Sequence, residues 1–215
     1  MRKKYKQKMS EIFIPLSKKD IYNHNIFIGY FCSWKNFHFA IDSIRSLLVI
    51  GSESIELQKL KSLLSSTPFI AVHIRRGNFG LSKINKDFHG ILPVEYYQNA
   101  QTLMTNLTGI TNFVFFTDNK LEASDLIKNL NISTYRIITA EDLSSQQETL
   151  ELMTYAAGII AANSSFSWWA AYLAKDSASV KIFPRPFFLK KGMQEGYLLM
   201  PNWLSVGFPK FENQA

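Results

Sequence analysis

The sequence has 215 residues, 47% of them hydrophobic and 14% aromatic, and a formal net charge of +7. This length and composition exclude a disordered protein and allow one large domain or a domain with part of a second. Cys32 is the single cysteine, which excludes an intrachain disulfide and a thiolate metal cluster. The positive charge favours an anionic partner, and nucleic acid, an acidic membrane surface and a phosphorylated small molecule all qualify.

The first residues carry no recognisable targeting signal. The basic residues 2–8 are interpreted as a solvated arm, and the apolar patch at residues 12–16 is too short for a signal-peptide core or for a membrane span of about 20 residues. Together with the single cysteine, which suits a reducing compartment, these features predict a cytoplasmic protein. Peripheral association with a membrane is compatible with the charge, and the sequence predicts no oligomeric state.

The first 53 residues follow a less regular pattern than the rest of the chain. Residues 26–31 predict a strand and residues 37–48 predict a helix, and no glycine-rich phosphate loop precedes them. We therefore treat residues 1–53 as one segment and residues 54–215 as another.

From residue 54 to residue 183, helical and strand patterns alternate. Strands are expected at 69–74, 113–116, 135–139, 158–162 and 180–183, and helices at 55–64, 93–107, 121–130, 146–157 and 165–174. The strands are almost continuously apolar, which is typical of a parallel sheet covered by helices on both faces. The fold class is therefore predicted to be α/β with a Rossmann-like parallel sheet. The aromatic, proline-rich segment beyond residue 183 is expected to wrap over this sheet.

The strand at 69–74 ends in a group of cations. Alternation along a strand places His73 and Arg75 on one face and Arg76 on the other. A guanidinium offers paired donors that match phosphate oxygens, and Gly77 allows a sharp turn or a close approach to a ligand. In open α/β sheets, ligands bind at this carboxyl edge. The alternative is an exposed basic turn after a core strand.

Two further strand ends carry polar residues. Asp118 follows an apolar strand and either caps the next helix or accepts hydrogen bonds from a base, for which the N1 and N2 hydrogens of guanine are well matched. The second strand end follows the buried strand at 158–162, where the chain turns into a helix. The free backbone N–H groups at the start of such a helix can bind a phosphate. This turn consists of Asn163, Ser164, Ser165, Phe166 and Ser167. Alternatively, a serine of this turn only caps the helix and binds no ligand.

The three strand ends fit one nucleotide-sugar ligand. A diphosphate would lie between Arg75 and the helix start at Ser165, and Asp118 would contact the base. The sequence holds no Asp-x-Asp, and its four histidines lack the spacing of a metal centre, so no metal is predicted.

Two motifs carry a resemblance to a known family. The run His73-Ile-Arg-Arg-Gly-Asn-Phe79 resembles the His-x-Arg-Arg-Gly-Asp-Tyr motif of the α-1,2-fucosyltransferases, glycosyltransferase family 11. The block from Ile159 to Leu173 is similar to that family's Ile-Ile-Ala-Asn-Ser-Ser-Phe-Ser-Trp-Trp-Gly-Ala-Tyr-Leu. The similarity extends over roughly residues 26–205.

The resemblance implies a two-lobed GT-B fold and an enzyme without metal or other cofactor. Its donor substrate would be GDP-β-L-fucose, and the fucosyl group would pass to the 2-hydroxyl of a terminal galactose in a glycan acceptor, with inversion of the anomeric carbon. The resemblance implies that His73 and Arg75 are the catalytic pair, with Arg75 on the β-phosphate and His73 near the guanine. The other donor-binding residues that it implies are Arg76, Asp118, Asn163, Ser164, Ser165, Phe166 and Ser167.

Two departures from the family pattern limit this reading. Asn78 replaces the aspartate of the motif, and an amide cannot act as a general base, so Asp87, His89 and Glu95 are weak candidates and the base is unassigned. A Gly-Gly-Leu-Gly-Asn-Gln-type segment is absent. We therefore expect an N-terminally truncated member, in which residues 1–53 are a remnant of the acceptor-side lobe and residues 54–215 are the GDP-sugar-binding domain.

Two other functions are weighed against the enzyme. The first is a catalytically impaired remnant that binds a GDP-sugar or a glycan, as Asn78 and the missing segment suggest. The second is a nucleic-acid-binding module, which only the positive charge suggests. The sequence holds no nucleic-acid motif and its basic residues are expected to be dispersed, so no nucleic-acid partner is predicted.

Overall fold

The computed structural model describes residues 3–8, 14–29, 33–47, 52–77, 83–190, 193 and 195–208. The chain divides into two compact units. Unit 1 comprises residues 1–49 and 190–202, and unit 2 comprises residues 50–189 and 203–215. The interpretation of the first 53 residues as the remnant of an acceptor-side lobe remains a prediction.

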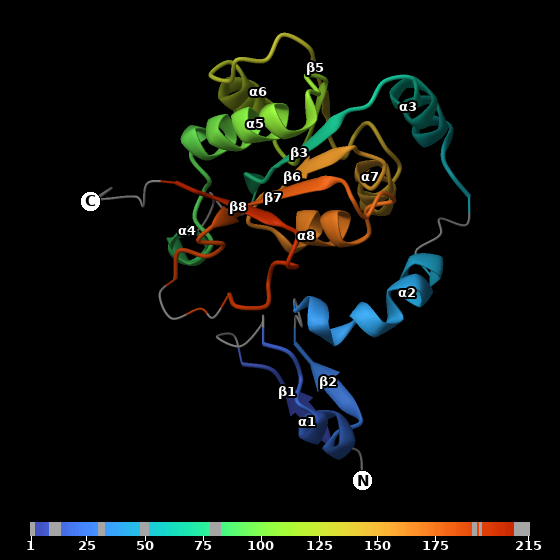
Figure 1. Cartoon of the computed structure of the whole chain (residues 1–215), viewed down its shortest axis with the longest axis vertical. Helices are drawn as coiled ribbons and strands as arrows, with labels where there is room; N and C mark the ends of the chain where they lie inside the picture. Colours follow the sequence, from blue (N-terminus) through green and yellow to red (C-terminus); the bar gives the residue numbers. More distant parts are fainter. Residues whose placement is uncertain are drawn as a thin grey trace. The chain divides into compact units, whose positions relative to one another are not determined.

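A parallel sheet forms the centre of unit 2 (Figure 1). Within the described residues it has six strands, in the order β5-β4-β3-β6-β7-β8. Every neighbouring pair is parallel. The strands are β3 (Ile70–Ile74), β4 (Phe113–Thr117), β5 (Tyr135–Ile138), β6 (Gly158–Ile160), β7 (Val180–Arg185) and β8 (Leu204–Gly207). The predicted α/β class with a Rossmann-like parallel sheet is therefore confirmed.

Helices lie between most of these strands. They are α3 (Ile55–Ser65), α4 (Lys83–Phe88), α5 (Val94–Thr108), α6 (Lys120–Ile127), α7 (Gln146–Met153) and α8 (Ser165–Tyr172). Their starts agree with the sequence, because the side chains of the N-cap residues Ser54, Asn119, Ser145 and Ser164 each accept a backbone N–H of the first turn. Helix α5 ends at Gly109, which adopts a left-handed conformation with φ of +71°.

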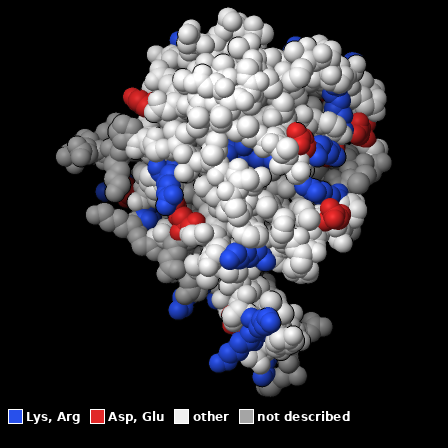
Figure 2. Space-filling view, viewed as in Figure 1, with Lys and Arg blue, Asp and Glu red and all other residues white. Residues whose placement is uncertain are grey.

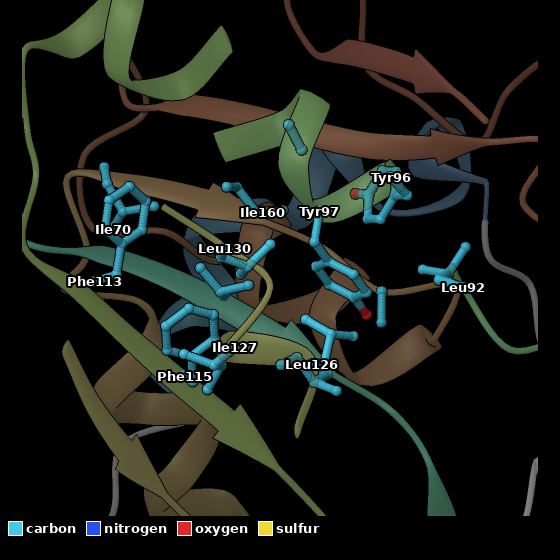
Figure 3. Packing of buried hydrophobic residues seen from close by; sticks show 14 of the residues in the cluster. Ile70, Leu92, Tyr96, Tyr97, Phe113, Phe115, Leu126, Ile127, Leu130 and Ile160 are labelled. Atoms are coloured by element: carbon cyan, nitrogen blue, oxygen red, sulfur yellow. The ribbon is translucent and has the colours of Figure 1, made fainter. Parts of the chain in front are cut away.

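Strand alternation directs apolar side chains to both faces of the sheet, and Figure 3 shows the cluster on one of these faces. The side chains of Ile70, Val72 and Ile74 lie in one apolar cluster with buried residues of α5 and α6. On the other face, the ring of Trp203 stacks on Phe183 of β7 with 4.9 Å between ring centroids. Helix α8 covers this face through Trp168, which is fully buried and contacts Trp203. Trp168 is thus a packing residue.

Two buried tyrosines of α5 hold the point at which β3 and β6 separate. The paired residues of these strands end at Val72 and Ile160. Just beyond, the hydroxyl of Tyr96 donates to the carbonyl of Ala161 at 2.6 Å, and that of Tyr97 donates to the carbonyl of His73 at 3.2 Å. Buried carbonyls need partners, and these hydroxyls supply them where the ladder stops.

Unit 1 contains short elements. In its described residues, β1 (Lys4–Lys6) pairs in parallel with β2 (Ile26–Ile28), and α1 (Lys18–Asn23) lies between them in the sequence. Two 3₁₀ turns (Trp34–Asn36 and His38–Ala40) lead into α2 (Ile41–Leu47). The expectation of a solvated N-terminal arm is therefore wrong for residues 4–6, because pairing with β2 orders them.

Several boundaries in unit 2 also differ from expectation. Strand β6 ends at Ile160 instead of 162, and α7 ends at Met153 instead of 157. The segment after residue 183 was expected to wrap over the sheet, but its residues 204–207 extend the sheet as β8, paired with β7. A four-residue edge strand gains its stability from that pairing, which no local pattern reveals.

A buried carboxylate joins α3 to α7. One oxygen of Glu148 accepts the backbone N–H of Ser54 at 2.8 Å, and the other accepts the Ser54 hydroxyl and the backbone N–H of Ser144, both at 2.9 Å. The hydrogen bond from the Ser54 backbone is the main cause that lowers the pKa of Glu148. The charged form is therefore favoured in the folded protein.

We predict that Glu148→Gln lowers the free energy of unfolding at pH 7 by about 1–3 kcal/mol. The NH₂ group of the glutamine would face the donors of Ser54 or Ser144, which would then lose their acceptor. The pKa of Glu148 in the folded protein lies below its ordinary value of 4.5. This contribution is therefore present above about pH 4.5 and is lost as the pH falls through the lower, folded pKa. Urea unfolding at pH 7 and pH 3.5 measures it. The exposed Glu141→Gln is the matched control, and equal unfolding free energies of Glu148→Gln and wild type at pH 7 would contradict the assignment.

Candidate active site

The chain reverses its direction of winding between β3 and β6. From β3 the next strands, β4 and β5, lie on one side, and from β6 the following strands, β7 and β8, lie on the other. Such a switch point leaves a crevice at the carboxyl ends of the two central strands, and ligands of open α/β sheets bind there. The segments at this edge are residues 75–77 after β3 and residues 161–165 after β6.

His73 is buried near the carboxyl end of β3. Its ring lies 5.4 Å, centroid to centroid, from the ring of Phe166 in the first turn of α8. Among the described residues, its Nδ1 atom has no hydrogen-bond partner. The pKa of His73 is lowered to about 4, mainly by burial; the charge of Asp118 opposes this shift and that of Arg75 contributes to it. His73 is therefore neutral near pH 7.

Arg75 and Asp118 form an ion pair across two strand ends. Nη1 of Arg75 lies 2.6 Å from Oδ2 of Asp118, and both side chains are partly exposed. Oδ1 of Asp118 accepts the backbone N–H of Arg76 at 2.8 Å. A Cβ on Gly77 would overlap the Asp118 carboxylate, so that only glycine fits here without displacing it. Asp118 is therefore held by two interactions, and the absence of a side chain at Gly77 leaves room for its carboxylate.

Arg76 points away from this group, as strand alternation predicted. Its Nη1 donates to the buried carbonyl of Leu92 at 3.2 Å, and its Nε lies 3.8 Å from the carboxylate of Glu122 on α6. With a side chain only 8% exposed, Arg76 is part of the packed layer of α5 and α6.

The turn after β6 is shaped by its own side chains. The Ser164 hydroxyl accepts the backbone N–H of Phe166 at 3.3 Å and caps α8. The buried Ser167 hydroxyl donates to the carbonyls of Ala162 and Ser164. Ser165 is the first residue of α8. The first backbone N–H groups of a helix lack intrahelical partners and carry its positive dipole end.

The side chain of Asn163 is directed to a loop that sequence reasoning did not connect with the site. Its amide donates to the carbonyls of His89 at 2.6 Å and Gly90 at 3.2 Å. Gly90 has φ of +69°, and a side chain there would overlap Leu189. Gly90 and Pro93 indicate a turn at this point of the sequence. No local pattern indicates that the carbonyl of Gly90 bonds to Asn163, which lies 73 residues away.

His89 belongs to an aromatic group at this loop. Its ring centroid lies 4.8 Å from that of Phe88 and 5.1 Å from that of Phe188. Burial, followed by the charge of Arg75, lowers the pKa of His89. Of the other weak candidates for a base, Asp87 and Glu95 are exposed on α4 and in the first turn of α5. Asn78 lies outside the described residues.

The family model named Glycosyl transferase family 11 matches residues 1–206. The chain belongs to glycosyl transferase family 11. This assignment confirms the resemblance to glycosyltransferase family 11 that the two motifs carry.

Two relatives of this family 11 chain come from Escherichia coli. The O-antigen biosynthesis glycosyltransferase WbnK is 27% identical over 136 residues, which cover 63% of this chain and 44% of that protein. An α-1,2-colitosyltransferase is 26% identical over 184 residues, which cover 84% of this chain and 62% of that protein. The chain thus spans about half the length of these relatives.

Solved structures of POFUT1 are partly similar to this chain. The complex of POFUT1 with GDP has a TM-score of 0.45 and 15% identity, over 77% of this chain and 57% of that chain. A complex with GDP-fucose has a TM-score of 0.39 and 17% identity, over 60% of this chain and 46% of that chain. At these scores the likeness is partial, and the family assignment rests on the family model.

The described residues contain neither a membrane-spanning helix nor a cluster of metal ligands. No described helix combines the length and the apolar character needed to cross a membrane. In the same part of the chain, no three His, Cys, Asp or Glu side chains converge as metal ligands would. Independence from metal remains a prediction of the family resemblance.

We predict that His73 stays neutral down to about pH 5 and gains its proton near pH 4, because burial opposes its charged form. Histidine side-chain NMR shifts recorded between pH 8 and pH 3.5 measure the midpoint, and a His73→Gln spectrum identifies the resonance. A midpoint near the ordinary 6.5 would show that water reaches the imidazole.

Proposed function

We propose that this chain transfers L-fucose from GDP-β-L-fucose to the 2-hydroxyl of a terminal galactose, with inversion of the anomeric carbon. The observation that carries the proposal is that Arg75 and the start of α8 follow neighbouring strands at the switch point of the sheet. A guanidinium and a helix N-terminus both bind phosphate, and together they form two sides of a diphosphate site.

The contact between His73 and Phe166 supports this arrangement. Because their rings lie 5.4 Å apart, the end of β3 reaches the first turn of α8. Arg75, one strand position beyond Ile74, would meet the β-phosphate of the donor. Backbone N–H groups at Ser164 and Ser165 would hold the diphosphate from the other side, whereas that of Phe166 is bonded to the Ser164 hydroxyl.

The proposed reaction is a direct displacement. The acceptor oxygen attacks the anomeric carbon of fucose as the bond to the β-phosphate oxygen breaks, and GDP leaves with the bonding electrons. Arg75 and the start of α8 would stabilise the negative charge that grows on the leaving diphosphate. The proton of the acceptor hydroxyl passes to a base that we leave unassigned.

We assign Asp118 a positioning role in this site. It binds the guanidinium of Arg75 through one oxygen and the backbone of Arg76 through the other, and it packs against Gly77. This arrangement would fix Arg75 before the donor binds, which lowers the entropic cost of binding. In this role Asp118 acts on the diphosphate through Arg75, whereas the family resemblance suggested contact with guanine.

We expect Asn163 and Ser167 to act indirectly as well. Their side chains bond to carbonyls of the protein and shape the turn that exposes the start of α8. Arg76 would serve the site mainly by packing against α5 and α6.

A second donor is suggested by the name of one relative. The α-1,2-colitosyltransferase is 26% identical to this chain, so colitosyl transfer through the same diphosphate site is the alternative reaction. Parallel assays with GDP-fucose and GDP-colitose and a galactoside acceptor would decide which sugar is transferred. Binding of GDP without turnover of either donor would instead favour a GDP-sugar-binding protein without activity.

We predict that Arg75→Ala lowers fucosyl transfer at least a hundredfold, because it removes a charged donor from the leaving group. Arg76→Ala should lower the free energy of unfolding by about 1–3 kcal/mol and reduce transfer less, since it loses a buried hydrogen bond outside the diphosphate site. GDP release from GDP-fucose with lactose measures transfer, and calorimetry measures GDP affinity. Equal activities of Arg75→Ala and wild type would refute the site.

We also predict that Asp118→Asn weakens binding of inorganic pyrophosphate and of GDP by similar factors of about tenfold, because the charged pair with Arg75 is lost. If Asp118 contacted only guanine, GDP affinity would fall and pyrophosphate affinity would not. The surface variant Asp125→Asn on α6 is the control and should bind both ligands as the wild type does.

A further inference from the structure

The net charge of the chain is confined to unit 1. Unit 1 contains eleven basic and four acidic residues, a net charge of +7, whereas unit 2 contains thirteen of each and is neutral. The basic residues are thus spread over both units, as expected, but their excess over acidic residues lies in unit 1. Figure 2 shows mostly basic side chains on the visible face of the part that contains α1, β1 and β2, and side chains of both signs over unit 2.

Much of this charge lies in a small described region. The described stretches 3–8 and 14–29 contain one acidic residue, Asp20, which accepts hydrogen bonds from Ser17 in the capping box of α1. The same stretches contain six exposed lysines, which we call the N-terminal basic surface: Lys3, Lys4, Lys6, Lys8, Lys18 and Lys19.

Apolar side chains are exposed among these lysines. On α1, directly after Lys18 and Lys19, Ile21 is 54% exposed and Tyr22 is 85% exposed. On β2, Ile28 is 48% exposed.

The register between β1 and β2 determines which side chains share a face of this two-stranded sheet. Lys6 pairs with Ile28, so an ammonium group and an exposed aliphatic group share a face. Tyr5 pairs with Phe27 on the other face, where both rings contact His24.

This combination suits one class of partner better than the others. Phosphates of a nucleic acid would be bound by the lysines but would leave Ile21, Tyr22 and Ile28 in water. At an anionic bilayer, lysine ammonium groups meet the headgroups, and aliphatic and tyrosine side chains enter the interface. We propose that the N-terminal basic surface docks the chain onto an anionic lipid bilayer through its six lysines and through Ile21, Tyr22 and Ile28.

The docking does not depend on the donor site or on the proposed reaction. Unit 2 carries no net charge, so attraction to an anionic surface acts on unit 1. Attraction of this kind falls off within a Debye length and weakens with salt, whereas insertion of apolar groups does not.

Flotation of the whole chain with lipid vesicles tests the proposal. The vesicles contain phosphatidylcholine with 30% phosphatidylglycerol, or phosphatidylcholine alone, at 0.05 M and 0.3 M salt. One variant replaces Lys4, Lys6, Lys18 and Lys19 by Gln, and its control replaces Lys59, Lys120, Lys128 and Arg136 of unit 2 by Gln. Both variants have the same total charge. A third variant carries Ile21→Ser and Tyr22→Ser.

We expect the wild type and the unit 2 control to bind the anionic vesicles equally and the unit 1 variant to bind at least a hundredfold more weakly, because each surface lysine contributes about fivefold. The Ile21→Ser/Tyr22→Ser variant should lose most of the binding that remains at 0.3 M salt. Equal binding of the two charge variants would overturn the proposal. Retention on duplex DNA without binding to anionic vesicles would overturn it in favour of nucleic acid.

Discussion

The candidate site depends on the parallel pairing of β3 with β6 and on the point at which that pairing stops. Beyond Val72 and Ile160 the two strands lead into different turns, and the hydroxyls of Tyr96 and Tyr97 take up carbonyls at the separation. The chain can therefore present a cation from one strand and a helix start from the next at one edge without leaving buried carbonyls unpaired.

Charge at this edge is arranged by burial as well as by ion pairing. Arg75 is held by Asp118, while burial favours the neutral forms of His73 and His89 near it. The fixed donors at this edge are thus one guanidinium, which its partner Asp118 orients, and the backbone N–H groups at the start of α8. A ligand whose charge grows during the reaction is stabilised best by such fixed groups, because they need no reorganisation. This arrangement agrees with the chemistry of a glycosyltransferase whose leaving group is a diphosphate.

The two units differ in net charge, so they suit two different kinds of electrostatic recognition. Unit 2 is neutral overall, so the proposed diphosphate would be recognised there by local geometry and hydrogen bonding. Unit 1 holds the whole charge excess, which acts over a Debye length and suits an extended anionic surface.

The sequence by itself determined the α/β class, most strands and helices of unit 2, and the faces on which His73, Arg75 and Arg76 lie. These features follow from local patterns, since strand alternation, apolar runs and cap residues act over a few residues. The tertiary structure alone decided that β8 extends the sheet, that Asp118 binds both Arg75 and the backbone of Arg76, and that Asn163 reaches the carbonyls of His89 and Gly90. Each of these contacts joins segments that are far apart in the chain, so its free energy depends on the packing of the whole sheet and no local pattern encodes it.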